Sequence, residues 1–413
     1  MDEKSLKPQL RFKGYTDAWE QRKFKNTILI ERGGSPRPIE EYITNSENGL
    51  NWIKIGDAPS MGKYITKTAE KIKPEGLSKT REVHPGDLIL SNSMSFGRPY
   101  IMAINGCIHD GWLLLRNDKN LYNLQFLCHL LGSENMLQQY KSFAAGSTVN
   151  NLNKELVGST TVSFPKKDEQ GKLGAFFNSI DNLITLHQRK LDKLGNVKKA
   201  LLEKMFPKND SNVPEIRFKG YTDAWEQRKF KNTILIERGG SPRPIEEYIT
   251  NSENGLNWIK IGDAPSMGKY ITKTAEKIKP EGLSKTREVH PGDLILSNSM
   301  SFGRPYIMAI NGCIHDGWLL LRNDKNLYNL QFLCHLLGSE NMLQQYKSFA
   351  AGSTVNNLNK ELVGSTTVSF PKKDEQGKLG AFFNSIDNLI TLHQRKLEKL
   401  KNIKKACLEK MFV

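Results

Sequence analysis

Short apolar runs, broken by Gly, Pro, Asn and Ser, occupy the chain between Trp19 and Pro165. Three of them, at residues 27–30, 87–90 and 160–164, predict short strands, and the second follows the turn sequence His-Pro-Gly. Residues 121–131 carry apolar side chains at helical spacing and predict a helix packed on those strands. This stretch is therefore expected to form a mixed α/β globule of about 150 residues.

The pattern changes at Lys172, where apolar residues begin to recur at intervals of four and three. They are Leu173, Phe177, Ile180, Ile184, Leu191, Leu194, Leu201 and Met205, with His187 and Lys198 as interruptions. The spacing is close to a heptad pattern and predicts one long helix over residues 168–206, which ends before Pro207. Packing on its own globule would cover the first half of this stripe, whereas the distal half needs another partner.

Both patterns occur twice. The segment Arg11–Leu191 recurs without a change as Arg217–Leu397, an identical run of 181 residues at an offset of 206. The second long helix is therefore expected over residues 374–413, with His393 and Lys404 as its interruptions. Beyond the identical run the copies differ at Asp192 against Glu398, Gly195 against Lys401, Val197 against Ile403, and Leu201 against Cys407. A repeat of this length is a domain rather than a solenoid unit.

The predicted fold class is α+β, with two mixed globules that are each followed by a long helix. The expected boundaries are 1–167 for the first globule, 168–206 for its helix, 207–216 for a linker, 217–373 for the second globule, and 374–413 for its helix. The second globule ties the end of one helix to the start of the other, so we expect the helices to pair as an antiparallel coiled coil. Two globules related by the resulting two-fold axis would match two inverted half-sites on a DNA duplex.

The chain is strongly basic, with 60 Lys and Arg against 44 Asp and Glu and a formal net charge of +16. This balance favours a polyanionic partner, either nucleic acid or an anionic membrane; a lysine-rich soluble surface is the alternative. No apolar run approaches the ~20 residues that span a bilayer, and the first residues lack the apolar core of a secretory signal. The five cysteines form no Cys-x-x-Cys pair, which indicates neither a zinc site nor a disulfide framework and fits a reducing cytoplasm.

The motifs of catalysis are not found in the sequence. Residues 56–63 imitate a phosphate-binding loop, but five residues separate the glycines and Tyr64 replaces the required Ser or Thr. No Gly-x-Gly-x-x-Gly and no Asn-Pro-Pro-Tyr or Asp-Pro-Pro-Tyr element occurs, and the histidines near Asp87 and Asp110 lack a recognisable nucleophile. The chain is therefore expected to be a non-enzyme without a cofactor or metal.

An ordered set of segments carries a family resemblance. They are Gly-Gly-Ser-Pro at 33–36, Tyr42, Asn-Trp-Ile-Lys-Ile-Gly-Asp at 51–57, Pro-Gly-Asp-Leu-Ile-Leu-Ser at 85–91, Gly-Ser-Thr-Val-Asn-Asn-Leu-Asn at 146–153, and Ser-Phe-Pro-Lys-Lys-Asp-Glu-Gln at 163–170. In this order the chain resembles the specificity subunit of type I restriction–modification systems, and its opening from Arg11 to Gln21 is similar to that of many such subunits from Gram-positive bacteria. Each segment alone is weak, but the set occurs twice and spans essentially the whole chain.

The resemblance implies two target-recognition domains on double-stranded DNA and a coiled coil that sets the distance between half-sites. It implies two methyltransferase and two restriction subunits as partners, which would carry adenine methylation and ATP-dependent cleavage, in the cytoplasm and away from membranes. Family members usually carry two different domains; here the domains are identical, which predicts an interrupted palindrome as the target. A stand-alone DNA-binding regulator, or a methyltransferase or nuclease acting alone, are the alternatives.

Three polar loops hold the candidate DNA contacts. Ser35 and Arg37 lie on a Gly- and Pro-rich loop that could face a phosphate, with an ordinary turn as the alternative. The segment 91–98 follows a strand and carries Asn92, Ser93, Ser95 and Arg98. Since Asn pairs bidentately with adenine and Arg with guanine, this segment is expected to read bases, unless it is simply a polar loop.

The third loop contributes Thr148 and Asn150, with Lys141 and Lys154 as expected phosphate contacts. His-Asp-Gly-Trp at 109–112 could also mark a site, although Trp112 is expected in the core. The second copy supplies Ser241, Arg243, Asn298, Ser299, Ser301, Arg304, Lys347, Thr354, Asn356 and Lys360 in the same roles. The basic residues of the helix ends are expected to be a solvated face, with attraction of the DNA backbone as the alternative.

Overall fold

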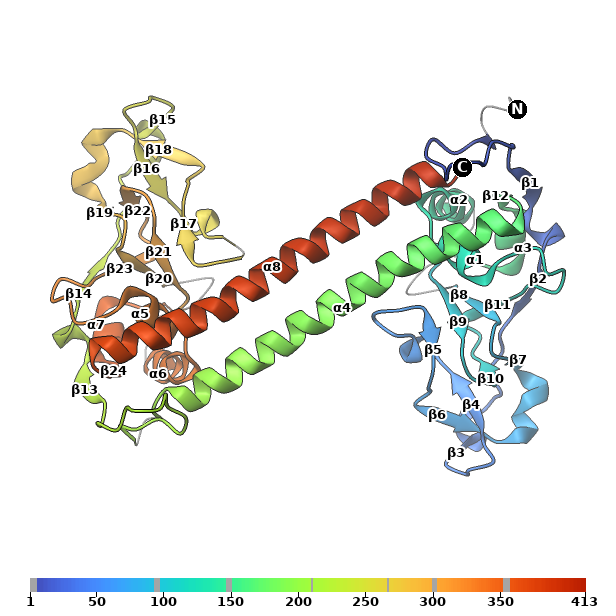
Figure 1. Ribbon diagram of the computed structural model, residues 1–413, viewed down its shortest axis with the longest axis horizontal. Coiled ribbons are helices and arrows are strands. Elements are labelled where there is room, and N and C mark those ends of the chain that lie inside the picture. Colours follow the sequence, from blue (N-terminus) through green and yellow to red (C-terminus); the bar gives the residue numbers. More distant parts are fainter. Residues whose placement is uncertain are drawn as a thin grey trace. The chain divides into compact units, whose positions relative to one another are not determined.

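The computed structural model describes residues 6–92, 97–145, 151–208, 211–265, 267–298, 303–351 and 357–413. The chain forms two compact units, and each takes in part of both long helices (Figure 1). Unit 1 consists of residues 1–188 and 396–413, and unit 2 of residues 189–395. Each long helix thus begins in one unit and ends in the other.

The strands of unit 1 are β1 (Glu20–Lys23), β2 (Leu29–Arg32), β3 (Ile43–Thr44), β4 (Leu50–Ile53), β5 (Tyr64–Ile65), β6 (Glu70–Ile72), β7 (Arg81–Val83), β8 (Leu88–Ser91), β9 (Pro99–Met102), β10 (Gly106–Ile108), β11 (Trp112–Arg116) and β12 (Thr161–Phe164). Its helices are α1 (Leu124–Leu131), α2 (Glu134–Ala145), α3 (Lys154–Ser159) and the start of α4 (Lys167–Met205).

Unit 2 repeats the order. Its strands are β13 (Glu226–Lys229), β14 (Leu235–Arg238), β15 (Ile249–Thr250), β16 (Leu256–Ile259), β17 (Tyr270–Ile271), β18 (Glu276–Ile278), β19 (Arg287–Val289), β20 (Leu294–Ser297), β21 (Pro305–Met308), β22 (Gly312–Ile314), β23 (Trp318–Arg322) and β24 (Thr367–Phe370). Its helices are α5 (Leu330–Leu337), α6 (Glu340–Ala351), α7 (Lys360–Ser365) and the start of α8 (Lys373–Met411).

Two mixed five-stranded sheets build unit 1, in the orders β3-β6-β4-β10-β7 and β2-β11-β8-β9-β5, beside a short β1-β12 pair. Side chains alternate between the two faces of β8: Ile89 belongs to the core shared by the two sheets, whereas Leu88 and Leu90 belong to the core beneath the helices. Both cores therefore meet at the second sheet, and its central strands are buried on both faces. Unit 2 has the same sheets in the same strand orders.

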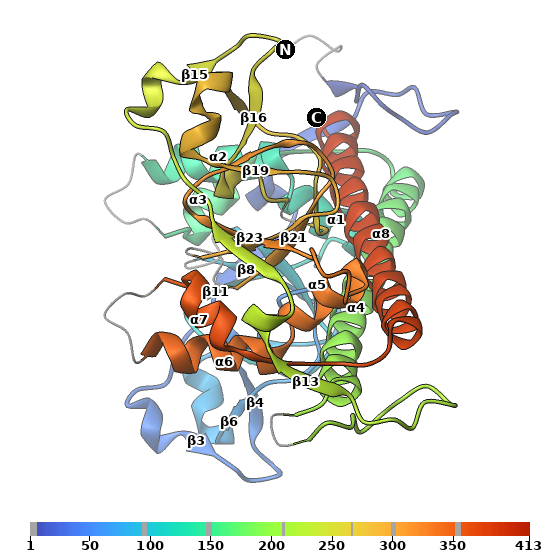
Figure 2. The ribbon, with the colours of Figure 1, turned by 90° about the vertical axis from the view of Figure 1, so that its left-hand side faces the viewer.

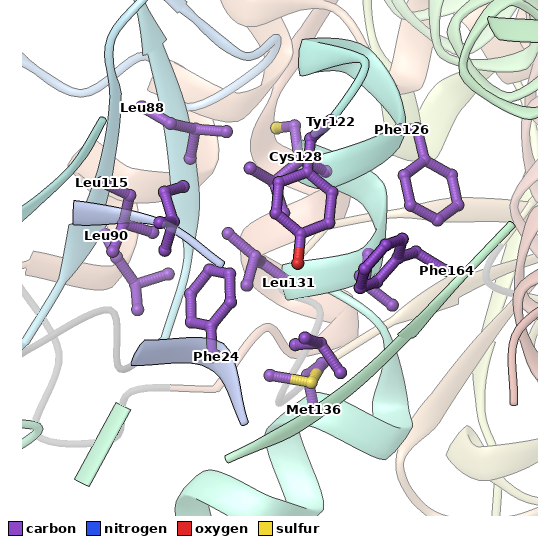
Figure 3. Close-up of a cluster of buried hydrophobic side chains, with 14 of the residues drawn as sticks. Phe24, Leu88, Leu90, Leu115, Tyr122, Phe126, Cys128, Leu131, Met136 and Phe164 are labelled. Carbon is purple, nitrogen blue, oxygen red and sulfur yellow. The ribbon is translucent and has the colours of Figure 1, made fainter. Parts of the chain in front are cut away.

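The larger core lies between the second sheet and the helices. Figure 3 shows Leu88, Leu90 and Leu115 of the sheet facing Tyr122 and Leu131 across this core. On the helical side, α1 contributes Phe126, Leu127, Cys128, Leu130 and Leu131 to this core, more than any other helix. Asn123 caps α1 by accepting a hydrogen bond from the backbone N–H of Phe126 at 3.1 Å, which fixes where the helix begins.

The sequence-based elements are largely confirmed. The predicted strands at 27–30, 87–90 and 160–164 correspond to β2, β8 and β12, and the predicted helix at 121–131 corresponds to α1. The two long helices are confirmed as α4 and α8. Two mixed α/β halves that each lead into a long helix agree with the predicted fold class.

The two long helices run antiparallel where they meet inside unit 1. Phe177 of α4 lies 5.5 Å, between ring centroids, from Phe412, just beyond the end of α8. Further along α4, Asp181 pairs with Lys404 of α8, which comes before Phe412 in the chain. The contacts therefore follow opposite directions along the two helices. Unit 2 repeats this arrangement with Phe383 and Phe206, and Figure 2 shows its two helix segments side by side. The predicted antiparallel pairing therefore holds within each unit.

The end of each long helix completes the core of the unit in which it ends. Phe412 is 6% exposed, stacks on Phe126 with ring centroids 5.5 Å apart, and meets the edge of Trp19. In unit 2, Phe206 is 4% exposed and stacks on Phe332 in the same way at 5.6 Å. The end of each apolar stripe is thus covered by the unit that it enters.

An extended segment fastens each helix end. In unit 1 the backbone N–H of Leu10 donates to the carbonyl of Lys410 at 2.9 Å. The linker of unit 2 makes the same bond at 2.9 Å, from Ile216 to Lys204. In unit 1, Arg11 follows Leu10 and forms a buried ion pair with Glu169 of α4, through two hydrogen bonds of 2.7 Å. The opening of the chain and the linker therefore play equivalent parts.

The two buried histidines of α1 and α5 should make folding sensitive to acid. Burial, with the nearby charge of Lys63 adding to it, lowers the pKa of His129 from 6.5 to about 3, and His335 is lowered to about 3 in the same way beside Lys269. Between pH 6.5 and 3 the unfolded histidine holds a proton that the folded one lacks, so the free energy of unfolding falls as the pH falls. The loss is about 2 kcal/mol per histidine at pH 5.

Urea unfolding at pH 7.5 and pH 5 measures this effect. His129→Gln together with His335→Gln should reduce the difference in unfolding free energy between the two pH values. An unaltered difference in the double variant would contradict the role of the buried pair.

Among the described residues, no helix is both long and apolar enough to cross a membrane.

Candidate nucleic-acid interface

The turn between β10 and β11 is the centre of the candidate interface. Nδ1 of His109 lies 2.9 Å from Oδ1 of Asp110 and accepts a hydrogen bond from the backbone N–H of Gly111 at 3.0 Å. The ring of His109 packs edge-on against the buried Trp52, with centroids 5.7 Å apart. The imidazole is therefore held on one side by the core while it remains 38% exposed on the other.

Ser35 and Arg37 reach this turn from the loop after β2. The hydroxyl oxygen of Ser35 accepts from the backbone N–H of Asp110 at 3.5 Å, and Nη2 of Arg37 lies 3.7 Å from Oδ2 of Asp110. The Arg37 side chain is 82% exposed. A guanidinium held this loosely is free to turn to a phosphate or a base edge.

The glycine pair at 33–34 explains how the loop approaches so closely. A Cβ atom at position 33 would lie 2.2 Å from the carbonyl oxygen of His109, and one at position 34 would lie 2.5 Å from that of Lys79. The Gly33 N–H also donates to the carbonyl of Trp112 at 2.9 Å. Only glycine fits at these two positions, so the sequence Gly-Gly places Ser35 and Arg37 over the turn.

Asn92 also joins the turn, but from beneath. Its side chain is 4% exposed, and its amide donates to the carbonyl of Asp110 at 2.8 Å. Its own carbonyl accepts from the N–H of Leu152 at 3.0 Å, which ties the third polar loop to the second. In this structure Asn92 holds the loops together, and its side chain does not face solvent.

Arg98 is directed elsewhere. Its guanidinium donates to the carbonyl of Ser60 at 3.2 Å and lies over the ring of Tyr100, 5.2 Å from the centroid. It lines a cavity of about 580 Å³ together with Lys63, Lys404 and other residues where α8 meets the domain. The structure therefore does not bring Arg98 to Asp110.

The two lysines lie on helices that flank these loops. Lys141 of α2 is 60% exposed and 4.0 Å from Glu134, and Lys154 begins α3, 58% exposed and 3.9 Å from Glu155. Tyr140, which precedes Lys141 on α2, packs closely against Gly97. A Cβ atom at position 97, where φ is +72°, would lie 2.8 Å from the Tyr140 ring. Both lysines are thus exposed cations on helices next to the loops that the sequence singled out.

Some of the predicted contacts fall outside the described residues. They are Ser93, Ser95, Thr148 and Asn150, with their counterparts Ser299, Ser301, Thr354 and Asn356. Their roles remain predictions.

Unit 2 builds the same cluster. Nη2 of Arg243 lies 3.6 Å from Oδ2 of Asp316, the Asn298 amide donates to the carbonyl of Asp316 at 2.8 Å, and Ser241 accepts from its N–H at 3.5 Å. A cavity of about 750 Å³ opens beside Arg243 and is lined also by Lys260 and His315, among others. Arg304, Lys347 and Lys360 occupy the positions of Arg98, Lys141 and Lys154.

His109 and Asp110 are not among the predicted DNA contacts, although the sequence indicated that residues 109–112 could mark a site. The signal was present: two ionisable residues and a glycine stand between the apolar strands β10 and β11. Trp112 is fully buried, as expected. Among the described residues, no group of three or more His, Cys, Asp or Glu side chains could hold a metal ion.

The same domain is recognised twice when the chain is compared with known families. The profile described as "Type I restriction modification DNA specificity domain" matches residues 17–196 and 222–402. The chain belongs to this family. The two matches correspond to the two copies of the repeat, and each includes the β10–β11 or β22–β23 turn together with the first part of a long helix.

Two relatives of this specificity family come from Methanocaldococcus jannaschii. The chain is 24% identical over 284 residues to the type I restriction enzyme MjaVIII specificity subunit, a match that spans 64% of each chain. It is 23% identical over 418 residues to the putative type I restriction enzyme MjaX specificity subunit, covering 94% of this chain and 91% of that one.

Solved structures share the fold. The type I restriction–modification S subunit from M. genitalium aligns over 99% of both chains with a TM-score of 0.60 and 16% identity. A chain from a study of complex assembly and conformational transition of the type I R-M system aligns over 95% of this chain and 97% of its own, with a TM-score of 0.55 and 18% identity. These likenesses concern the whole two-domain architecture.

Proposed function

We propose that this chain is the DNA-reading subunit of a type I restriction–modification complex and catalyses no step itself. Each unit would read one half-site of a bipartite duplex target with the loops around Asp110 or Asp316. The observation that carries the proposal is the pair of identical clusters in which Arg37 and Arg243 are exposed over a buried support. A net charge of +16 favours attraction of the phosphate backbone.

Identical readers lead to a symmetric target. The 181 identical residues include every member of the cluster, so both units prefer the same bases. Because the helices run antiparallel within each unit, we infer that the half-sites are inverted repeats of each other, separated by a gap. The target is then an interrupted palindrome.

The partners are methyltransferase and restriction subunits, two of each, working on cytoplasmic DNA. Leu183 and Leu186 of α4 are 45% and 46% exposed and lie three residues apart, on one face of the helix. Leu389 and Leu392 of α8 repeat this pair at 46% and 45%. One uncovered apolar pair in each unit supports docking of one methyltransferase subunit per unit.

Co-expression with the methyltransferase subunit, followed by sequencing of the methylated DNA, tests the proposal. Methylation confined to one interrupted palindrome, and dependent on this chain, is the expected result. Methylation that is the same without the chain would refute the role of reader.

A further inference from the structure

The apolar stripe of each long helix is interrupted by a lysine that meets a carboxylate of the other helix. In unit 1, Nζ of Lys404 in α8 lies 2.6 Å from Oδ1 of Asp181 in α4. In unit 2, Nζ of Lys198 in α4 lies 2.5 Å from Oδ1 of Asp387 in α8. The two interruptions are therefore partners in ion pairs between the helices.

Each carboxylate is shared with the domain that it faces. Nζ of Lys63, in the loop before β5, lies 3.1 Å from Oδ2 of Asp181, and Lys269 lies 3.4 Å from Oδ2 of Asp387. Lys63 also donates to Nε2 of His129 on α1. One carboxylate thus joins two helices and a domain at a single point.

These charges are largely withdrawn from water. The side chains of Lys63, Asp181 and Lys404 are 13%, 20% and 26% exposed. Burial by itself would raise the pKa of Asp181, but the hydrogen bond from Lys404 and the charges of Lys404 and Lys63 outweigh it and keep the pKa below its ordinary value. The carboxylate therefore stays ionised and keeps both lysines paired.

The apolar stripe alone would leave the register of the helices poorly specified. Residues at intervals of four and three repeat every heptad, so a slip of seven residues again sets apolar side chains against apolar ones. After such a slip, Asp181 would face Leu397 or Met411 in place of Lys404. The carboxylate would keep Lys63 but lose the bond from Lys404, and Lys404 would lie in the apolar stripe without its partner, so the pair favours one register.

We propose that Asp181 and Asp387 are positioning residues that fix the register of the two long helices, and thereby the number of base pairs between the two half-sites. This rests on the proposed function. The length of the helices sets the approximate number of base pairs between the half-sites, and the shared carboxylates restrict that number to one value.

The test uses two double variants in the complex with the methyltransferase subunits. Asp181→Asn with Asp387→Asn removes both shared charges. Lys198→Met with Lys404→Met removes only the cross-helix partners, leaves Lys63 and Lys269 paired, and continues the apolar stripe, so that folding is retained. The matched control is Glu203→Gln with Glu409→Gln, which removes exposed pairs with Lys199 and Lys405 on the same helices.

Sequencing of methylated DNA then gives the distribution of gaps. The unaltered chain and the control should methylate sites of a single gap. Both double variants should methylate sites whose gap differs by one or more base pairs at least tenfold more often than the unaltered chain does. A merely structural role would lower the yield of complex without adding new gaps.

A single, unchanged gap in assembled complexes of the methionine variant would overturn the proposal, even if the asparagine variant failed to fold. That result leaves the proposed function standing. If the unaltered chain itself directs methylation to no specific motif, the proposed function fails first, so the two failures can be told apart.

Discussion

Phe412→Ala is expected to lower the free energy of unfolding of unit 1 by about 3–5 kcal/mol, the usual cost of truncating a buried phenylalanine. The ring is 6% exposed and touches the rings of Trp19, Phe126 and Phe177. Because these partners belong to the first copy of the repeat, the cost appears in unit 1 although the substituted residue closes the second copy. Phe206→Ala should destabilise unit 2 by a similar amount.

Urea unfolding followed by tryptophan fluorescence measures both changes, since Trp19 and Trp225 lie against the two rings. Leu186→Ala on the same pair of helices is the control, because Leu186 is 46% exposed and its truncation should change stability by less than about 0.5 kcal/mol. Equal effects of Phe412→Ala and Leu186→Ala would mean that the helix end does not complete the core.

The second large effect is expected at the exposed arginines. Arg37→Ala and Arg243→Ala should each weaken binding of the specific duplex roughly ten- to hundredfold, which corresponds to about 1–3 kcal/mol for one base contact. Since each arginine is 82% exposed and its nearest carboxylate oxygen is 3.6–3.7 Å away, neither change should affect folding. The two single variants should have equal effects, because their surroundings are identical in sequence.

Binding titrations at one fixed salt concentration measure these losses. Arg22→Ala removes the same charge from β1, where Arg22 pairs with Glu20, and is the matched control. If Arg22→Ala weakened duplex binding by as much, Arg37 would contribute only its positive charge and no specific contact. Unequal losses at Arg37 and Arg243 would contradict the symmetry of the two readers.

Strands and helices with a clear period could be predicted from the sequence. The runs at 87–90 and 160–164 lie within one residue of β8 and β12, since turn residues bound them. The strand β11, Trp112–Arg116, was not predicted, although it is an apolar run buried on both faces, as β8 is. The long helices were predicted by their spacing over many turns.

The candidate site could be predicted only in part. The loops at 32–38 and 91–98 were recognised by their composition, but whether a side chain faces solvent or the core depends on the fold. Asn92 and Arg37 illustrate the difference, since the first is 4% and the second 82% exposed. The convergence of both on Asp110 needs the pairing of β11 with β2 and β8, which no local pattern encodes.

The ion pairs that Lys198 and Lys404 form between the long helices could not be predicted from the apolar periodicity. Lys198 and Lys404 break the apolar rhythm, and from the sequence they are simply exceptions. Their partners lie 189 residues away in one case and on the opposite helix in both. Such long-range pairs become visible only when the antiparallel arrangement is known.

The most direct test of the account is the symmetry of the methylated motif. The chain should be co-expressed with its methyltransferase partner in a host that lacks other adenine methylation, and the modified positions mapped by sequencing of genomic DNA. Two half-sites that are inverted repeats of each other, at one fixed gap, are predicted by two identical readers. Two unrelated half-sites would contradict the account.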